Sequence, residues 1–102
     1  MKNFRTFDLA VTFYRSVQTL RLPAYLRDQL LRAASSVALN LAEGRGKQTI
    51  ADQKRFFSIA LGSVRECEAV LILAGLQDRE AMGTLDSLGA HLYNLIKRAE
   101  KA

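Results

Sequence analysis

The scarcity of helix-breaking residues is the feature that most constrains the fold. Pro23 is the only proline, and six glycines leave long segments uninterrupted. Because proline and glycine are the residues that most disfavour a helix interior, most of the chain is free to be helical. No segment shows the sustained alternation of polar and apolar residues that is typical of a strand. The sequence therefore predicts an all-α protein.

Two helices are expected in the first half, where apolar residues recur at steps of three and four. The first is predicted from about Thr6, as its N-cap, to about Arg21. The second is predicted to begin at Pro23, which suits a first helical turn, and to reach Glu43. Gly44 would follow as its C-cap, and Gly44 and Gly46 would permit positive φ in the turn between the helices.

Two more helices are expected in the second half. Thr49 to Asp52 resembles a capping box at the start of a long third helix, which Gly75 ends. Asp78 is expected to cap a fourth helix that continues to about Ala99. Since the connections are short, an up-down-up-down four-helix bundle over residues 1–102, as a single domain, is predicted.

Self-association is also expected. A chain of 102 residues buries only about 60–65% of its unfolded surface, so one small core leaves the fold marginal. Neighbouring copies would cover more apolar area. The prediction is therefore a homo-oligomer.

Catalytic chemistry finds little support. His91 is the only histidine, and we interpret it as a surface or interhelical residue rather than a base. Cys67 has Val64 and Leu71 one turn away, which favours a small core residue over a nucleophile. The segment Gly44–Thr49 lacks phosphate-loop spacing and follows a helix, so it is interpreted as a turn. We expect no enzyme, no metal and no cofactor.

The location is expected to be the cytoplasm of a bacterial cell. The longest uncharged stretches, Ala33–Ala42 and Ala69–Gln77, are too short to span a bilayer. The segment Met1–Arg5 has no apolar core of a signal peptide. A single cysteine allows no disulfide within the chain, which fits a reducing compartment.

Polar residues along the second and third helices form a candidate structural network. Its members are Arg32, Ser36, Asn40, Glu43, Ser63 and Glu66. In an antiparallel pair, position 32 is expected opposite 62–63, with Glu66 about one turn further along and within reach of Arg32. An ion pair between Arg32 and Glu66, within a subunit or across an interface, is one hypothesis. A solvated polar face is the other.

The net charge of +5 falls at one end of the predicted bundle. There, nine basic residues face four acidic ones, whereas charges cancel elsewhere. The basic residues are Lys2, Arg5, Arg45, Lys47, Lys54, Arg55, Lys97, Arg98 and Lys101.

We take six of these as candidate nucleic-acid-binding residues: Arg45, Lys47, Lys54, Arg55, Lys97 and Arg98. The alternative is that they complement helix dipoles and favour solubility. Phe4, Phe7, Phe56 and Phe57 are expected in the core, so base stacking is not predicted.

Two segments, Leu31–Lys47 and Arg55–Glu66, resemble the four-helix-bundle proteins called 23S rRNA-intervening-sequence proteins. Positions of that family's pattern correspond to Arg32, Ser36, Asn40, Glu43, Gly44, Gly62, Ser63 and Glu66, whereas Val37-Ala38 replaces its Ile-Pro. The resemblance implies a closed ring of bundles, typically a homopentamer, with no established catalytic activity. It also implies a relationship to the accessory proteins of diversity-generating retroelements, which are pentameric barrels that bind nucleic acid and a reverse transcriptase.

Two functions follow. The first is a ring-forming, non-enzymatic bundle that binds nucleic acid through a basic rim, with RNA favoured over DNA. The second is a structural or adaptor oligomer that recognises a protein partner, a reverse transcriptase being one that the family relationship suggests.

Overall fold

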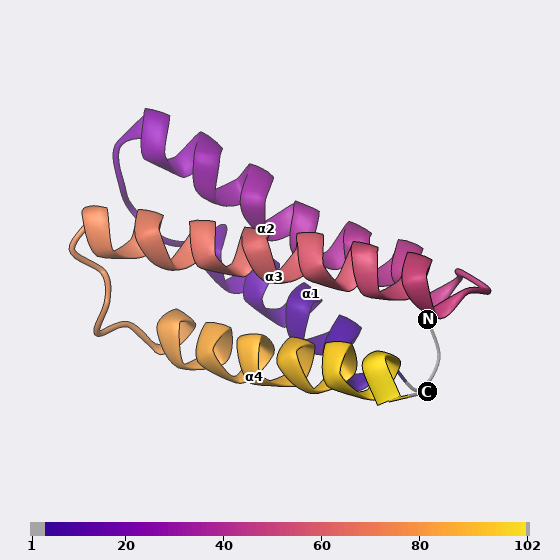
Figure 1. Ribbon diagram of the computed structural model, residues 1–102. Helices are drawn as coiled ribbons and strands as arrows, with labels where there is room; N and C mark the ends of the chain where they lie inside the picture. Colours follow the sequence, from indigo (N-terminus) through magenta and orange to yellow (C-terminus); the bar gives the residue numbers. More distant parts are fainter. Residues whose placement is uncertain (1–3, 102) are drawn as a thin grey trace.

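The structure, a computed structural model, describes residues 4–101. They form four helices and no strand: α1 (Arg5–Val17), α2 (Ala24–Arg45), α3 (Ile50–Leu73) and α4 (Glu80–Lys101) (Figure 1). The prediction of an all-α chain with four helices is confirmed.

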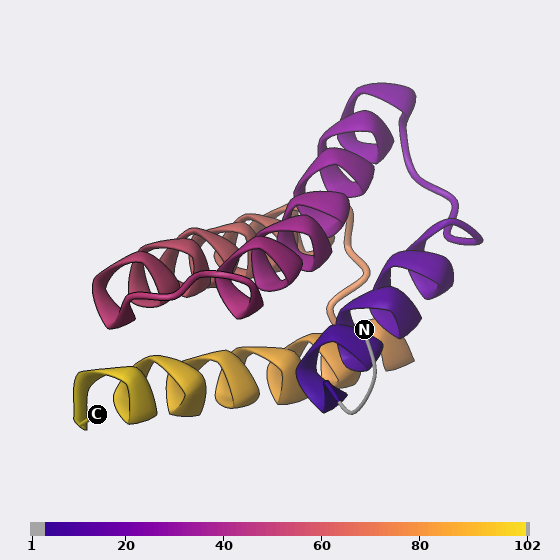
Figure 2. The ribbon, with the colours of Figure 1, turned by 90° about the vertical axis from the view of Figure 1, so that its right-hand side faces the viewer.

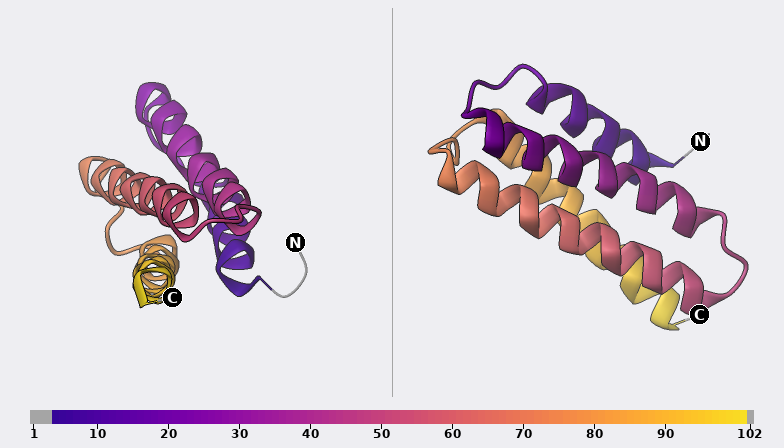
Figure 3. Two further views of the ribbon diagram at one scale, coloured as in Figure 1. Left: turned by 45° about the vertical axis from the view of Figure 1, so that its right-hand side comes forward. Right: turned by 90° about the horizontal axis from the view of Figure 1, so that it is seen from above.

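The helices run alternately up and down. In Figure 1, the α2–α3 turn lies at the same end as the start of α1 and the end of α4, and the other two connections lie at the opposite end. The view from above in Figure 3 shows the same arrangement. Each helix packs on its neighbours in the chain and α1 also packs on α4, which closes the bundle, whereas the diagonal pairs do not pack together.

The core lies along the bundle axis and receives side chains from all four helices. Its fully buried large members are Phe13, Leu30, Leu41, Leu71, Leu85, Leu88, Leu92, Val17, Val37, Val64 and Cys67. They recur at three- and four-residue steps, as the burial of one helix face requires. The bundle is elongated, with principal extents of 41 × 21 × 18 Å.

Helix α1 differs from the prediction at both ends. It begins at Arg5, with Phe4 in the N-cap position, so Thr6 is a buried residue of the first turn rather than the cap. It ends at Val17 instead of Arg21. The Arg27 guanidinium donates hydrogen bonds of 2.9 and 3.0 Å to the carbonyl oxygens of residues 18 and 20. These carbonyls are therefore satisfied without continuing the helix.

Helix α2 runs past the predicted end at Glu43. It includes Gly44 and reaches Arg45, with Gly46 as the C-cap at a φ of −84°. The predicted C-cap at Gly44 was wrong, and neither Gly44 nor Gly46 uses the positive φ that glycine permits. Gly44 serves packing instead, because a Cβ there would lie 2.7 Å from Cε1 of Phe57. The missing side chain lets α2 and α3 approach closely where they join.

The predicted boundaries of α3 are confirmed. At its start, the Thr49 hydroxyl accepts a hydrogen bond of 3.2 Å from the Asp52 amide. At its end, Gly75 has a φ of 73°, and the Leu76 amide donates to the Leu71 carbonyl at 2.8 Å. This is the Schellman arrangement, in which glycine adopts the left-handed conformation and the next apolar residue, here buried, covers the helix end.

Helix α4 begins at Glu80, one residue later than an N-cap at Asp78 would place it. The N-cap position is therefore Arg79, and Asp78 lies one residue outside it. The prediction that Asp78 caps this helix was wrong. A turn bond from the Arg79 amide to the Leu76 carbonyl, at 3.2 Å, extends the connection from α3 and delays the helix.

The close contact at Gly44 gives the first testable prediction. Gly44→Ala should lower the free energy of unfolding by about 1–2 kcal/mol, since strain against Phe57 exceeds the gain in helix propensity. Gly83→Ala is the matched control, because no atom lies within 4 Å of its added Cβ, and it should raise stability by up to about 1 kcal/mol. Urea denaturation measures both, and equal stabilisation by the two changes would contradict the packing role of Gly44.

Candidate nucleic-acid interface

The bundle topology gathers basic side chains at one end, which we call the basic end. Figure 2 looks at this end, where the start of α1, the α2–α3 turn and the end of α4 meet. Its described basic residues are Arg5, Arg45, Lys47, Lys54, Arg55, Lys97 and Arg98. All are exposed except Lys47, which is half-buried. The six candidate nucleic-acid-binding residues are thus all at the same end of the molecule.

The charge at this end is unbalanced. Three described acidic residues accompany the seven basic ones, namely Asp8, Glu43 and Asp52, which leaves a local excess of +4. Lys2 lies outside the described residues, as do the side chains of Glu100 and Lys101. At the opposite end, which we call the neutral end, three basic and three acidic residues cancel in charge. They are Arg21, Arg27, Arg79, Asp28, Asp78 and Glu80.

Hydrogen bonds within the α2–α3 turn fix the spacing of its cations. The Lys47 amide donates to the Gly44 carbonyl at 3.2 Å, and the Gln53 side-chain amide donates to the Lys47 carbonyl at 2.9 Å. Glu43 and Lys47 form an ion pair at 3.6 Å across one helical turn. Because both groups are substantially exposed, this pair holds position more than it adds stability.

Two phenylalanine rings position three of the basic side chains. The Arg45 guanidinium lies 4.4 Å from the centroid of the Phe4 ring. The Lys47 ammonium and the Arg55 guanidinium lie 5.1 and 4.8 Å from the centroid of the Phe56 ring. Such cation–π contacts restrain flexible side chains while leaving their charge available.

The expectation that all four phenylalanines belong to the core holds only in part. Phe4 and Phe57 are buried, and Phe7 packs against the core. Phe56 is half-buried beneath two cations. Sequence reasoning missed its positioning role, although the succession of Lys54, Arg55 and Phe56 was a signal that could have indicated it.

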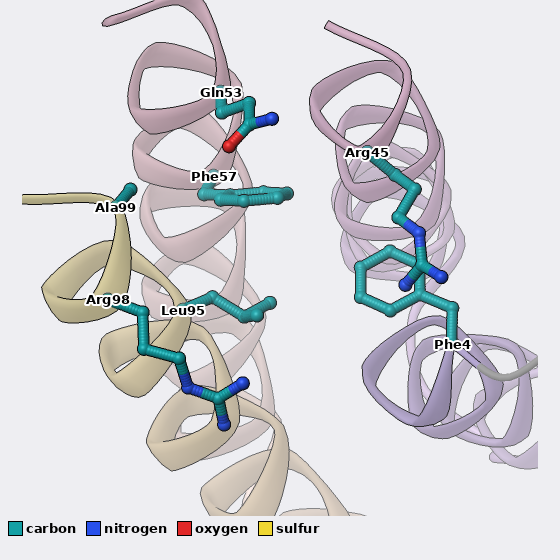
Figure 4. A pocket seen from close by; sticks show the side chains of 7 residues that line it. All are labelled: Phe4, Arg45, Gln53, Phe57, Leu95, Arg98 and Ala99. Carbon is teal, nitrogen blue, oxygen red and sulfur yellow. The ribbon is translucent and has the colours of Figure 1, made fainter. Parts of the chain in front are cut away.

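A cavity of about 290 Å³ opens at the basic end, lined by the N-cap residue of α1 and by residues of α2, α3 and α4 (Figure 4). Phe4, Phe57, Leu95 and Ala99 give it apolar walls. Its polar residues are Arg45, Gln53 and Arg98. The sequence did not predict this cavity, because its lining comes from four separate segments.

The candidate polar network is partly assembled. The hydroxyl oxygens of Ser36 and Ser63 lie 2.9 Å apart and join α2 to α3. The Asn40 side-chain amide donates to the carbonyl and the hydroxyl oxygen of Ser36, at 2.9 and 3.0 Å. Glu43 is directed to Lys47 instead.

Arg32 and Glu66 lie outside this cluster, and both are exposed. Among the ion pairs of the described residues, none joins them within the chain. Because Ser36 is opposite Ser63, Arg32 lies at the level of residues 66–67 rather than opposite 62–63 as expected. The two charges are therefore level with each other on the outer surface, and a pair across an interface stays a prediction.

The other sequence candidates occupy structural positions. Cys67 is fully buried, and burial, with smaller contributions from the carboxylates of Glu66 and Glu68, raises the pKa of its thiol to about 12. His91 is half-buried on α4. Within the described part of the chain, no three His, Cys, Asp or Glu side chains gather as a metal site would require. Nor does any described helix have the length and apolarity needed to cross a bilayer.

The fold and its basic end define a small four-helix-bundle protein with a candidate polyanion-binding surface. A family model described as 23S rRNA-intervening sequence protein matches residues 4–100, and the chain belongs to this family. A search of the curated proteins finds no match to this chain.

Burial of Cys67 predicts a loss of stability at alkaline pH. The folded state keeps the thiol neutral up to a pKa of about 12, whereas the unfolded chain ionises near its ordinary value of 9.0. The stabilisation is present at neutral pH and should disappear as the pH rises from about 9 towards 12, by about 1 kcal/mol per pH unit. Between pH 7 and pH 10, the urea midpoint of unfolding should fall further for the wild type than for Cys67→Ala. Equal decreases for the two proteins would contradict this.

Proposed function

We propose that the protein is a non-enzymatic oligomer that binds the phosphate backbone of nucleic acid, with RNA favoured over DNA. The observation that carries the proposal is the charge difference between its two ends. Seven described basic side chains collect at one end of a bundle whose other end has no net charge. Phosphate neutralisation by such a cluster releases counterions and drives binding.

The state of the basic side chains supports this assignment. At the neutral end, Arg27 is engaged by the carbonyls of the α1–α2 connection. At the basic end, Arg45 and Arg55 contact aromatic rings, and no carboxylate of the described residues pairs with either. These guanidinium groups remain available to phosphate oxygens, with which they form bidentate hydrogen bonds.

The family supports RNA as the target. Its description refers to an intervening sequence of 23S rRNA. Base readout requires a helix or β-ribbon that enters a groove of the nucleic acid. The basic side chains lie instead at helix ends and in a turn, so we expect backbone contacts to dominate. We therefore expect affinity without strong sequence preference.

The oligomer in this proposal is a cyclic homopentamer, as the family resemblance implies. Its support in the structure is an apolar surface on the outer side of α2 and α3, which we call the outer face. Leu39 is 65% exposed on α2 and Leu73 is 73% exposed on α3. Isolated exposed leucines are ordinary, but a regular set of them indicates an interface.

The outer face is regular. On α2, Tyr25, Arg32 and Leu39 lie seven residues apart, and on α3 so do Ile59, Glu66 and Leu73. The contact between Ser36 and Ser63 sets the register of the two helices. This register places Leu39 level with Ile59 on one side of Arg32 and Glu66, and Tyr25 level with Leu73 on the other. A second copy of the chain would cover these apolar residues and supply partners for both charges.

Disruption of the outer face tests the assembly. Leu39→Asp with Leu73→Asp should reduce the mass from that of an oligomer to that of a monomer, because charges would be buried without partners. Tyr93→Asp is the control, since Tyr93 is an exposed aromatic residue on α4. Light scattering at micromolar concentration gives the masses, and a monomeric wild type would remove the oligomer from the proposal.

The second candidate function is an adaptor that binds a protein partner, such as a reverse transcriptase. The observation that favours it is an apolar groove between α1 and α2, lined by Val11, Tyr14, Ser35, Ala38 and Leu39. Under this reading, the groove and the outer face recognise the partner and the basic end is incidental.

RNA binding at different salt concentrations distinguishes the two functions. The double change Lys54→Glu and Arg55→Glu should weaken binding of unrelated RNAs about tenfold or more. The slope of log affinity against log salt concentration should fall by an amount that corresponds to about two phosphate contacts. The control is Arg21→Glu with Arg79→Glu at the neutral end, which leaves Arg27 and its two hydrogen bonds intact. It should change affinity much less. Equal losses for the two variants, or no binding at low salt, would favour the adaptor.

A further inference from the structure

We infer that the cavity at the basic end binds a single nucleotide, as a nucleoside monophosphate or as the unpaired, phosphorylated end of a strand. This inference deepens the proposed function and rests on it, because the nucleotide would be delivered by a nucleic acid held on the surrounding cations. The cavity lies at the basic end, between the last residue of α2, the first turns of α3 and the end of α4 (Figure 4).

The charge of the lining selects for an anion. Arg45 on α2 and Arg98 on α4 stand on opposite sides of the cavity (Figure 4), and no acidic residue is among those that line it. Within the described residues, neither guanidinium is paired with a carboxylate. A phosphate at the opening would receive charge-assisted hydrogen bonds from both sides.

The remaining lining selects for more than a phosphate. Phe4, Phe57, Leu95 and Ala99 are apolar, so an inorganic anion would leave these walls without a partner. A planar base would fill the space against them. Within the described residues, the amide oxygen of Gln53 accepts no hydrogen bond, while its nitrogen donates to the Lys47 carbonyl. In Figure 4, this oxygen is turned towards the Phe57 side of the cavity, where it would accept a bond from a base N–H.

The size of the cavity limits the ligand to one nucleotide. Its volume of about 290 Å³ is at the lower end of the range for small-molecule pockets, about 300–1,000 Å³. A base pair is about twice the size of a single base, so this volume favours an unpaired base. The free monophosphate and the unpaired strand end share the same chemistry, so the experiment must separate them.

The first arm of the test titrates the full chain with UMP, AMP, uridine, ribose 5-phosphate and inorganic phosphate by calorimetry and NMR. We expect UMP or AMP to bind at least tenfold more tightly than the nucleoside or either base-free phosphate, with shift changes at Gln53, Phe57 and Leu95. Binding of all phosphates with equal affinity would overturn the inference, because it would show an anion site only.

Two variants test the position of the site. Arg98→Gln should weaken mononucleotide binding about tenfold, since it removes one charged hydrogen-bond donor. Arg79→Gln, at the neutral end, should leave it unchanged. Ala99→Leu keeps every charge but fills the cavity, so it should abolish mononucleotide binding while binding of a blunt RNA duplex persists. Thermal unfolding confirms that each variant folds, and full mononucleotide binding by Ala99→Leu would overturn the inference.

The second arm compares blunt RNA duplexes with duplexes that carry one unpaired 5′-phosphorylated nucleotide. Tighter binding of the overhang by the wild type, lost in Ala99→Leu, would identify the strand end as the ligand. Equal binding of both duplexes, together with mononucleotide binding, would identify the free nucleotide. If blunt duplexes bind, mononucleotides do not bind and the overhang does not increase duplex affinity, the cavity inference fails and the proposed function stands. If no RNA binds, the proposed function itself fails.

Discussion

The close approach of α2 and α3 at Gly44 is the constraint on which the rest of the molecule depends. A side chain at this position would overlap the ring of Phe57, so glycine lets α2 and α3 approach closely where they join. The short turn then brings Arg45, Lys47, Lys54 and Arg55 to the same end. Phe57 in turn forms one wall of the cavity at that end. The packing contact at Gly44 thus links the junction of α2 and α3 to the geometry of the candidate site.

The basic end differs from an ordinary charged surface because several of its side chains are restrained. A free lysine or arginine loses up to about 2 kcal/mol of rotamer entropy when it is fixed on a ligand. Arg45 on Phe4, and Lys47 and Arg55 on Phe56, have part of that freedom removed before any ligand arrives. The restraint lowers the entropic cost of binding and aligns the charges with one another.

The fold was predictable from the sequence because few residues interrupt helical periodicity. Helix ends that depend on local signals, such as Thr49 and Gly75, were predicted correctly. The ends that depend on distant contacts were not. The carbonyls that end α1 are bound by Arg27, which lies seven and nine residues further along the chain. Gly44 is required by its contact with the ring of Phe57 on another helix.

The same distinction applies to the candidate site. The six basic residues could be assigned to one end from topology alone. The aromatic supports and the cavity could not, because they arise from segments that meet only after folding.

The uneven distribution of charge makes the molecule electrostatically asymmetric along its 41 Å axis. At physiological ionic strength the Debye length is about 8 Å, so the basic end and the neutral end are screened from each other. A polyanion approaching the bundle would therefore interact with one pole and scarcely with the other. The torque from this asymmetry would turn the long axis towards the polyanion before contact, so that encounters occur end-on instead of along the sides of the helices.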